Sequence, residues 1–62
     1  MIWTKQAIRA LRTSFNWTQV EMAEQMGVTK STVARWEQGV KKPSTPSQRL
    51  LTLLKERERD SL

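Results

Sequence analysis

A helix stop and a helix start stand only two residues apart near the middle of this 62-residue chain. Gly27 can adopt the left-handed conformation that ends a helix, and the hydroxyl of Thr29 can cap the first turn of the next one. Two short helices joined through so tight a turn form a helix-turn-helix unit. The sequence therefore predicts such a unit over about residues 18–38.

Caps and stops also bound the helices in the N-terminal half of the chain. Thr4 can cap a helix that runs to about residue 14, and Asn16 tolerates the backbone conformation that ends it. Thr18 and Glu21 have the spacing of a capping box, in which each side chain satisfies a backbone N–H of the other. Two short helices are therefore expected before the turn at Gly27.

The C-terminal half shows the same kind of boundaries. Gly39 can end the third helix, and Ser44 followed by Pro46 can begin a fourth over about residues 45–57. No segment alternates between apolar and polar residues as a strand does. The expected fold class is all-α, a compact domain of four and possibly five helices that spans residues 1–62 as a single unit.

Apolar residues recur at helical spacing within the predicted helices. The expected core residues are Ile8, Leu11, Phe15, Val20, Met22, Ala23, Met26, Val33 and Trp36. Trp17 is placed to form a hydrophobic staple with Met22. Trp3 fits either a lid over the core or a contact with a second copy. Four leucines between residues 50 and 54 can bury one side and leave another for a partner.

The composition argues against catalytic sites, metal sites and membrane-spanning segments. The chain has no cysteine and no histidine, and it has only two glycines. Thiolate and imidazole metal sites, an imidazole base and glycine-rich phosphate loops are therefore absent, so we expect no enzyme activity, no metal and no cofactor. No apolar run is long enough to span a bilayer. A cytoplasmic location is expected.

The formal net charge of +5 is unevenly distributed. Residues 1–15 and 30–43 carry the excess of basic residues, and the stretch between them is acidic. In the third predicted helix, polar and basic residues lie opposite the apolar stripe. The major groove of DNA is about 12 Å wide and accepts one α-helix with such a polar face. The pattern favours a helix that binds in this groove.

The order of these residues resembles that of a known family. The segment from Trp17 to Gly39, with Arg12 before it and Pro43 after it, is similar to the lambda-repressor-like helix-turn-helix family, also called the Cro/repressor or XRE type. The similarity covers about residues 8–54. Its most specific positions are Arg12, Gln19, Ala23, Gly27, Val28, Val33, Trp36, Glu37, Gln38, Gly39 and Pro43.

The resemblance implies a role for individual residues. Those implied to contact DNA bases are Lys30, Ser31, Thr32 and Arg35. Those implied to contact phosphates are Gln19, Thr29, Gln38, Lys41 and Lys42. Arg12 and Glu37 are implied to form a structural ion pair between the first and third helices. Many members of the family have five helices, whereas this chain ends shortly after its fourth, so the resemblance leaves the position of a dimer surface open.

The function expected from these residues is sequence-specific binding of double-stranded DNA, with repression or autorepression by a homodimer on an inverted-repeat operator. An alternative is an antitoxin or phage accessory protein whose main role is to bind a partner protein, such as a toxin. A basic peptide on a membrane surface is disfavoured, because the apolar residues are divided among short capped helices.

Overall fold

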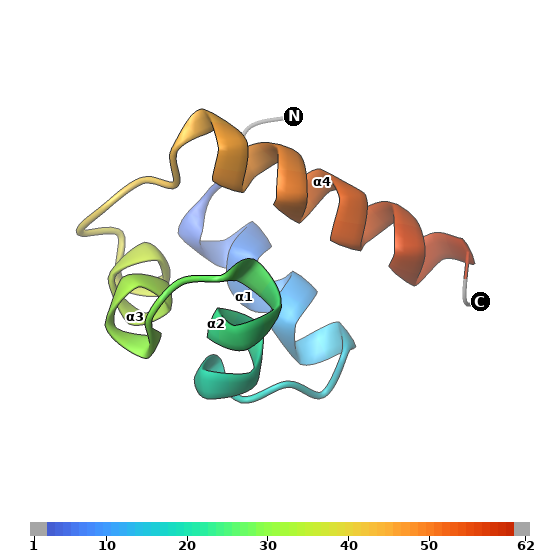
Figure 1. Ribbon diagram of the computed structural model, residues 1–62, viewed down its shortest axis with the longest axis horizontal. Coiled ribbons are helices and arrows are strands. Elements are labelled where there is room, and N and C mark those ends of the chain that lie inside the picture. Colours follow the sequence, from blue (N-terminus) through green and yellow to red (C-terminus); the bar gives the residue numbers. More distant parts are fainter. Residues whose placement is uncertain (1–2, 61–62) are drawn as a thin grey trace.

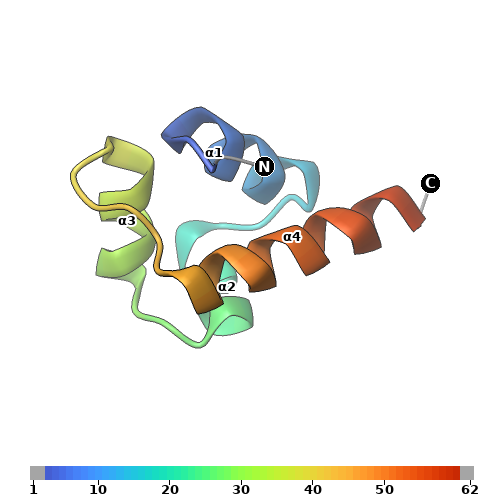
Figure 2. The ribbon, with the colours of Figure 1, turned by 90° about the horizontal axis from the view of Figure 1, so that it is seen from above.

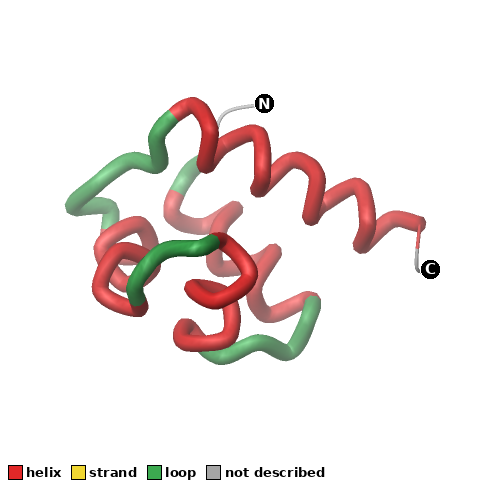
Figure 3. The backbone as a smooth tube through the Cα atoms, in the orientation of Figure 1, coloured by secondary structure: helices red, strands yellow, loops and turns green. Residues whose placement is uncertain are grey.

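The computed structural model describes residues 3–60, in which four helices and no strand are found (Figure 3). The helices are α1 (Lys5–Ser14), α2 (Gln19–Met26), α3 (Lys30–Gln38) and α4 (Thr45–Asp60). The predicted all-α fold is confirmed. The predicted domain also included residues 1–2 and 61–62, which lie outside the described residues.

The first three helices each begin at a threonine cap. The hydroxyls of Thr4, Thr18 and Thr29 accept hydrogen bonds from the backbone N–H three residues later. At Thr18 the capping box is complete, because Glu21 also accepts from the Thr18 N–H at 2.9 Å. These bonds satisfy donors that the helix itself leaves unpaired, and so fix where each helix starts.

A left-handed residue follows each of the same three helices within two positions. Asn16, Gly27 and Gly39 have φ values of 58°, 69° and 78°. After α2, Gly27 is the cap, and Val28 N–H donates to the Ala23 carbonyl at 3.0 Å, which reverses the chain direction in a Schellman arrangement. The turn predicted between Gly27 and Thr29 is therefore present.

The helices pack so that α3 and α4 occupy different sides of the molecule. Both α3 and α4 contact α1 and α2 (Figures 1 and 2). In the two views α3 lies at one end of the molecule, and the C-terminal part of α4 projects toward the other. The buried apolar residues between them are Trp3, Ile8, Leu11, Met22, Ala23, Met26, Val33, Trp36, Leu51 and Leu54.

One expected core residue is exposed. Val20 is 46% exposed, although the sequence suggested that it shared the buried face of α2. Met22, Ala23 and Met26 form that face, and Val20 lies about 110° around the helix from its centre. The prediction was wrong because α2 has only one narrow face against its neighbours.

The fourth helix is longer than predicted. Pro46 is its second residue, whereas the sequence suggested that it would be the first. The helix continues to residue 60 instead of about 57, since Glu56–Arg59 are good helix formers and Arg57 and Arg59 suit the negative end of the helix dipole. Pro46 occupies the second helical position, where its missing N–H is still one that the helix leaves unpaired. No helix within residues 3–60 has the length and apolar character needed to cross a membrane.

Two tryptophans close the edges of the core. Trp3 is 7% exposed, and its indole N–H donates to the Thr52 hydroxyl at 3.2 Å, so it covers the core beneath α4. Trp17 stacks on Phe15 with ring centroids 4.4 Å apart, and both pack against the core from the turn between α1 and α2. This stacking was not foreseen, because it joins residues within a loop instead of within a helix.

Candidate nucleic-acid interface

One face of α3 is exposed and polar while the opposite face is buried. Ser31, Arg35 and Gln38 are exposed, and they lie within about 60° of one another around the helix. Val33 and Trp36 are buried on the other side. The buried pair fixes α3 to the core, so the polar face is presented outward on a rigid helix.

Three residues at the start of α3, Thr29, Lys30 and Thr32, differ in how free their side chains are to contact a ligand. Lys30 is exposed, whereas Thr32 is half-buried. The hydroxyls of Thr29 and Thr32 lie 3.0 Å apart and share a hydrogen bond, and Thr29 also accepts from the Thr32 N–H. Any contact from Thr29 to an anion therefore relies on the N-terminal N–H groups of α3 more than on its own hydroxyl.

The residues expected to contact phosphates flank this helix on two sides. Lys41 and Lys42 are exposed in the loop after α3, and they line a surface hollow together with Thr32. Gln19, the first residue of α2, is half-buried. Gln38 lines a second hollow beside Lys5 and Arg9 of α1. The structure thus brings the predicted residues of α3 and its following loop to a common region.

A buried carboxylate holds α3 against α1. Glu37 is 3% exposed, and its Oε2 accepts from Arg12 Nε at 2.7 Å while its Oε1 accepts from Arg12 Nη2 at 3.0 Å. Arg12 Nη1 donates to the Trp17 carbonyl at 2.9 Å. The predicted ion pair is present, and it also binds the turn that precedes α2. One guanidinium therefore sets the position of α3 relative to the start of α2.

A second arginine contacts the same carboxylate, and this contact was not predicted from the sequence. Arg9 reaches Glu37 Oε1 with its Nε at 3.4 Å while most of its side chain stays exposed. Gln19, at the start of α2, also acts to lower the pKa of the Glu37 carboxyl. The spacing of Arg9 and Arg12, three residues apart on one helix, places both on the same side of α1 and was the available indication.

These contacts change the pKa of both members of the ion pair. Burial acts to raise the pKa of Glu37, but hydrogen bonds and charge from Arg12, with further hydrogen bonds from Gln19 and Arg9, outweigh it and hold the pKa below its ordinary value. The hydrogen bond to Glu37 raises the pKa of Arg12. Both groups are therefore charged near neutral pH.

Acid is expected to weaken the fold through Glu37. Because its pKa is lower in the folded chain, the unfolded chain binds more protons in the window below about pH 4.3, and stability falls as the pH drops through that window toward the folded pKa. Urea unfolding at a series of pH values measures this loss. The double variant R12M/E37L lacks the group, so its stability should fall less steeply there; an equally steep fall in both proteins would contradict the assignment to Glu37.

The comparison with known families gives one match. A family model described as helix-turn-helix matches residues 8–54, which is most of the chain and includes most of α1, all of α2 and α3, and the first part of α4. No curated protein matches the chain. The match covers α2 and α3, which flank the turn at Gly27, and it includes Arg12 and Glu37, which position these helices.

Proposed function

Because the chain belongs to the XRE-type helix-turn-helix family of DNA-binding regulators, we propose that it represses transcription by binding an inverted-repeat operator as a homodimer. A two-fold dimer presents two copies of α3 about one helical turn of DNA apart, roughly 34 Å, and so matches two half-sites of opposite direction. Where such an operator overlaps a promoter, the bound dimer excludes RNA polymerase.

The single observation that carries this proposal is the division of α3 into an exposed polar face and a buried face. Ser31, Arg35 and Gln38 face outward while Val33 and Trp36 anchor the helix. A helix inserted into the major groove needs this arrangement, since the base edges offer hydrogen-bond donors and acceptors and the anchoring residues must stay with the protein.

The proposed contacts divide into two groups. In the proposed complex, Lys30, Ser31, Thr32 and Arg35 face base edges, and Arg35 has the geometry to bond both O6 and N7 of a guanine. Gln19, Thr29, Gln38, Lys41 and Lys42 face phosphates. The half-buried position of Thr32 and its bond to Thr29 make it the base contact with the least freedom to move.

Selection of bound sites from random duplexes, followed by sequencing, tests the proposal. The expected outcome is an enriched inverted repeat whose half-sites are centred about 10 base pairs apart. The matched control is the R35A variant, which should select a motif that is less restricted at one position of each half-site. Recovery of unenriched sequence by the wild-type chain would overturn the proposal.

Replacing Lys42 with alanine is expected to weaken binding to every DNA sequence by a similar factor. Its ammonium is exposed in the loop after α3 and is proposed to neutralise one phosphate. Loss of that contact should reduce the slope of log K against log salt by about one counterion per protomer. Titrations at several salt concentrations measure the slope, with Lys55→Ala on α4 as the matched control. An unchanged slope in K42A would remove Lys42 from the interface.

A further inference from the structure

The outer face of α4 carries an exposed leucine between two opposite charges. Leu53 is 55% exposed, and Arg49 and Glu56 are exposed near it on the same side of the helix. Leu51 and Leu54 bury the opposite side in the core. Neither Arg49 nor Glu56 forms an ion pair with another residue in the part of the chain that the structure describes. We call Arg49, Leu53 and Glu56 the α4 stripe.

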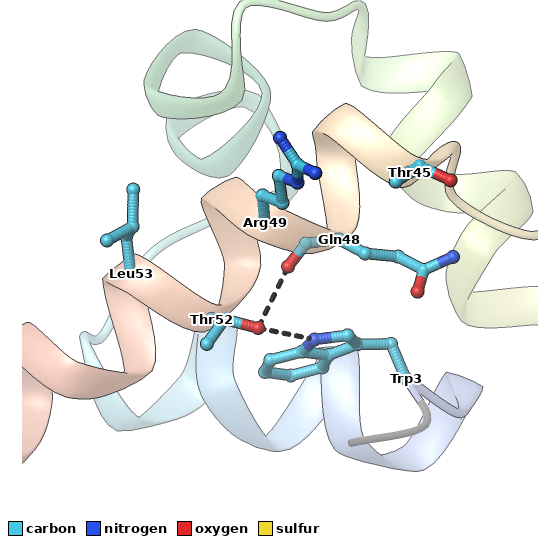
Figure 4. A pocket seen from close by; sticks show the side chains of 6 residues that line it. All are labelled: Trp3, Thr45, Gln48, Arg49, Thr52 and Leu53. Atoms are coloured by element: carbon cyan, nitrogen blue, oxygen red, sulfur yellow. Dashed lines mark hydrogen bonds between the residues drawn. The ribbon is translucent and has the colours of Figure 1, made fainter.

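A hollow lies beside this stripe. It has a volume of about 470 Å³ and is lined by Trp3 and by α4 residues that include Gln48, Thr52 and Leu53. In Figure 4, Arg49 and Leu53 extend from α4 on the side away from Trp3, whose ring is held under the helix by its bond to Thr52. The hollow adds apolar surface next to Leu53, so this side of α4 offers more apolar contact area than the leucine alone.

The α4 stripe is complementary to a second copy of itself. Arg49 and Glu56 are seven residues apart, about 10.5 Å along the helix axis, and they lie at equal distances on either side of a point between Thr52 and Leu53. A two-fold axis through that point pairs two antiparallel α4 helices. Arg49 of each copy then faces Glu56 of the other, and the two Leu53 side chains meet between these two ion pairs.

We propose that the second copy in the homodimer binds through the α4 stripe, in an antiparallel pair of α4 helices with two reciprocal Arg49–Glu56 ion pairs. This inference rests on the proposed function in that it assumes a dimer, but it adds the surface and the pairing. Burial of Leu53 supplies the apolar contact, and the charges select the antiparallel direction. A second copy also adds buried apolar area, of which a chain of this size has little.

The arrangement leaves the proposed DNA-binding helix accessible. α4 packs against α1 and α2 through its inner side, and α3 lies at the other end of the molecule from the projecting part of α4. Pairing through the outer side of α4 therefore uses a surface separate from the one that carries Ser31, Arg35 and Gln38. One chain can bind its copy and DNA at the same time.

Charge reversal and charge exchange test the pairing. In sedimentation equilibrium of the full chain, R49E and E56R are each expected to raise the dimer dissociation constant about tenfold, because each places like charges opposite each other twice. An equimolar mixture of R49E and E56R restores both ion pairs between unlike copies. Native mass spectrometry should then show a dimer that contains one copy of each variant.

The control is R57E, which makes the same charge change on α4 outside the stripe, at a position that faces the neutral Gln48 across the proposed axis. Its dissociation constant should stay within about twofold of the wild-type value. A wild-type chain that stays monomeric up to about 1 mM, or an R49E variant that dimerises as the wild type does, would overturn the proposal. So would a mixture that forms no mixed dimer.

Failure of this interface and failure of the proposed function have different results. An inverted repeat selected by the wild-type chain, together with unchanged dimerisation of R49E, removes the α4 interface and leaves the DNA-binding function. Reciprocal rescue in the mixture, together with no selected motif, keeps the interface and removes the function.

Discussion

Replacing Glu37 with glutamine is expected to lower the free energy of unfolding by about 2–4 kcal/mol. Glu37 is 3% exposed, and its carboxylate accepts two hydrogen bonds from Arg12 and one from Arg9. A neutral amide removes the charge and turns one oxygen into a donor that faces the Arg12 guanidinium. The half-buried guanidinium is then left without a counter-charge, which costs more than the pair contributed when complete.

Urea unfolding followed by circular dichroism measures the change. Glu24→Gln makes the same chemical change at an exposed position of α2 and should alter the free energy of unfolding by less than about 0.5 kcal/mol. The double variant R12M/E37L, which replaces both charges with apolar groups, should be more stable than E37Q. If E37Q unfolds at the same urea concentration as the wild type, the buried ion pair does not hold α3 in place.

Replacing Arg35 with alanine is expected to weaken binding to the selected operator by about 1–3 kcal/mol per contact, a factor of about 5 to 150. Arg35 is exposed on the outward face of α3, and its guanidinium can make two hydrogen bonds to one guanine. The loss should be much smaller on random DNA, since phosphate contacts supply most of the affinity there.

Fluorescence anisotropy with operator and random duplexes at one salt concentration measures both losses. Arg57→Ala is the matched control, because it removes the same side chain from an exposed position of α4. It should change neither affinity by more than about twofold. An R35A variant that binds operator and random DNA equally weakly would show that Arg35 contacts phosphate and not a base.

The features predicted well from sequence are those set by residues a few positions apart. The capping box at Thr18 and Glu21 and the stop at Gly27 involve bonds that close within five residues, so their residue types alone specify them. The core stripe of α3 followed from spacing alone for the same reason. The end of α4 did not, because no capping residue marks it.

The features that sequence did not reveal depend on how the helices are placed in space. The contact of Arg9 with Glu37 joins positions 28 apart, and it requires α1 and α3 to cross at a particular point. The bond from Trp3 to Thr52 spans 49 positions. Sequence left Trp3 open between a lid and a contact with a second copy, and only the packed structure puts its ring against the core. For the residues proposed to contact bases and phosphates, the structure shows which side chains are exposed and on which elements they lie.

The short-range helix boundaries have a consequence for how this chain reaches its folded state. Three helices start and stop through bonds between near neighbours, so their ends are set locally, and packing between neighbouring helices then stabilises these short segments. Helical domains built in this way fold within microseconds to milliseconds. Ribosomes add about 5–20 residues per second, so synthesis of the chain takes several seconds. Folding of this domain should thus keep pace with its synthesis.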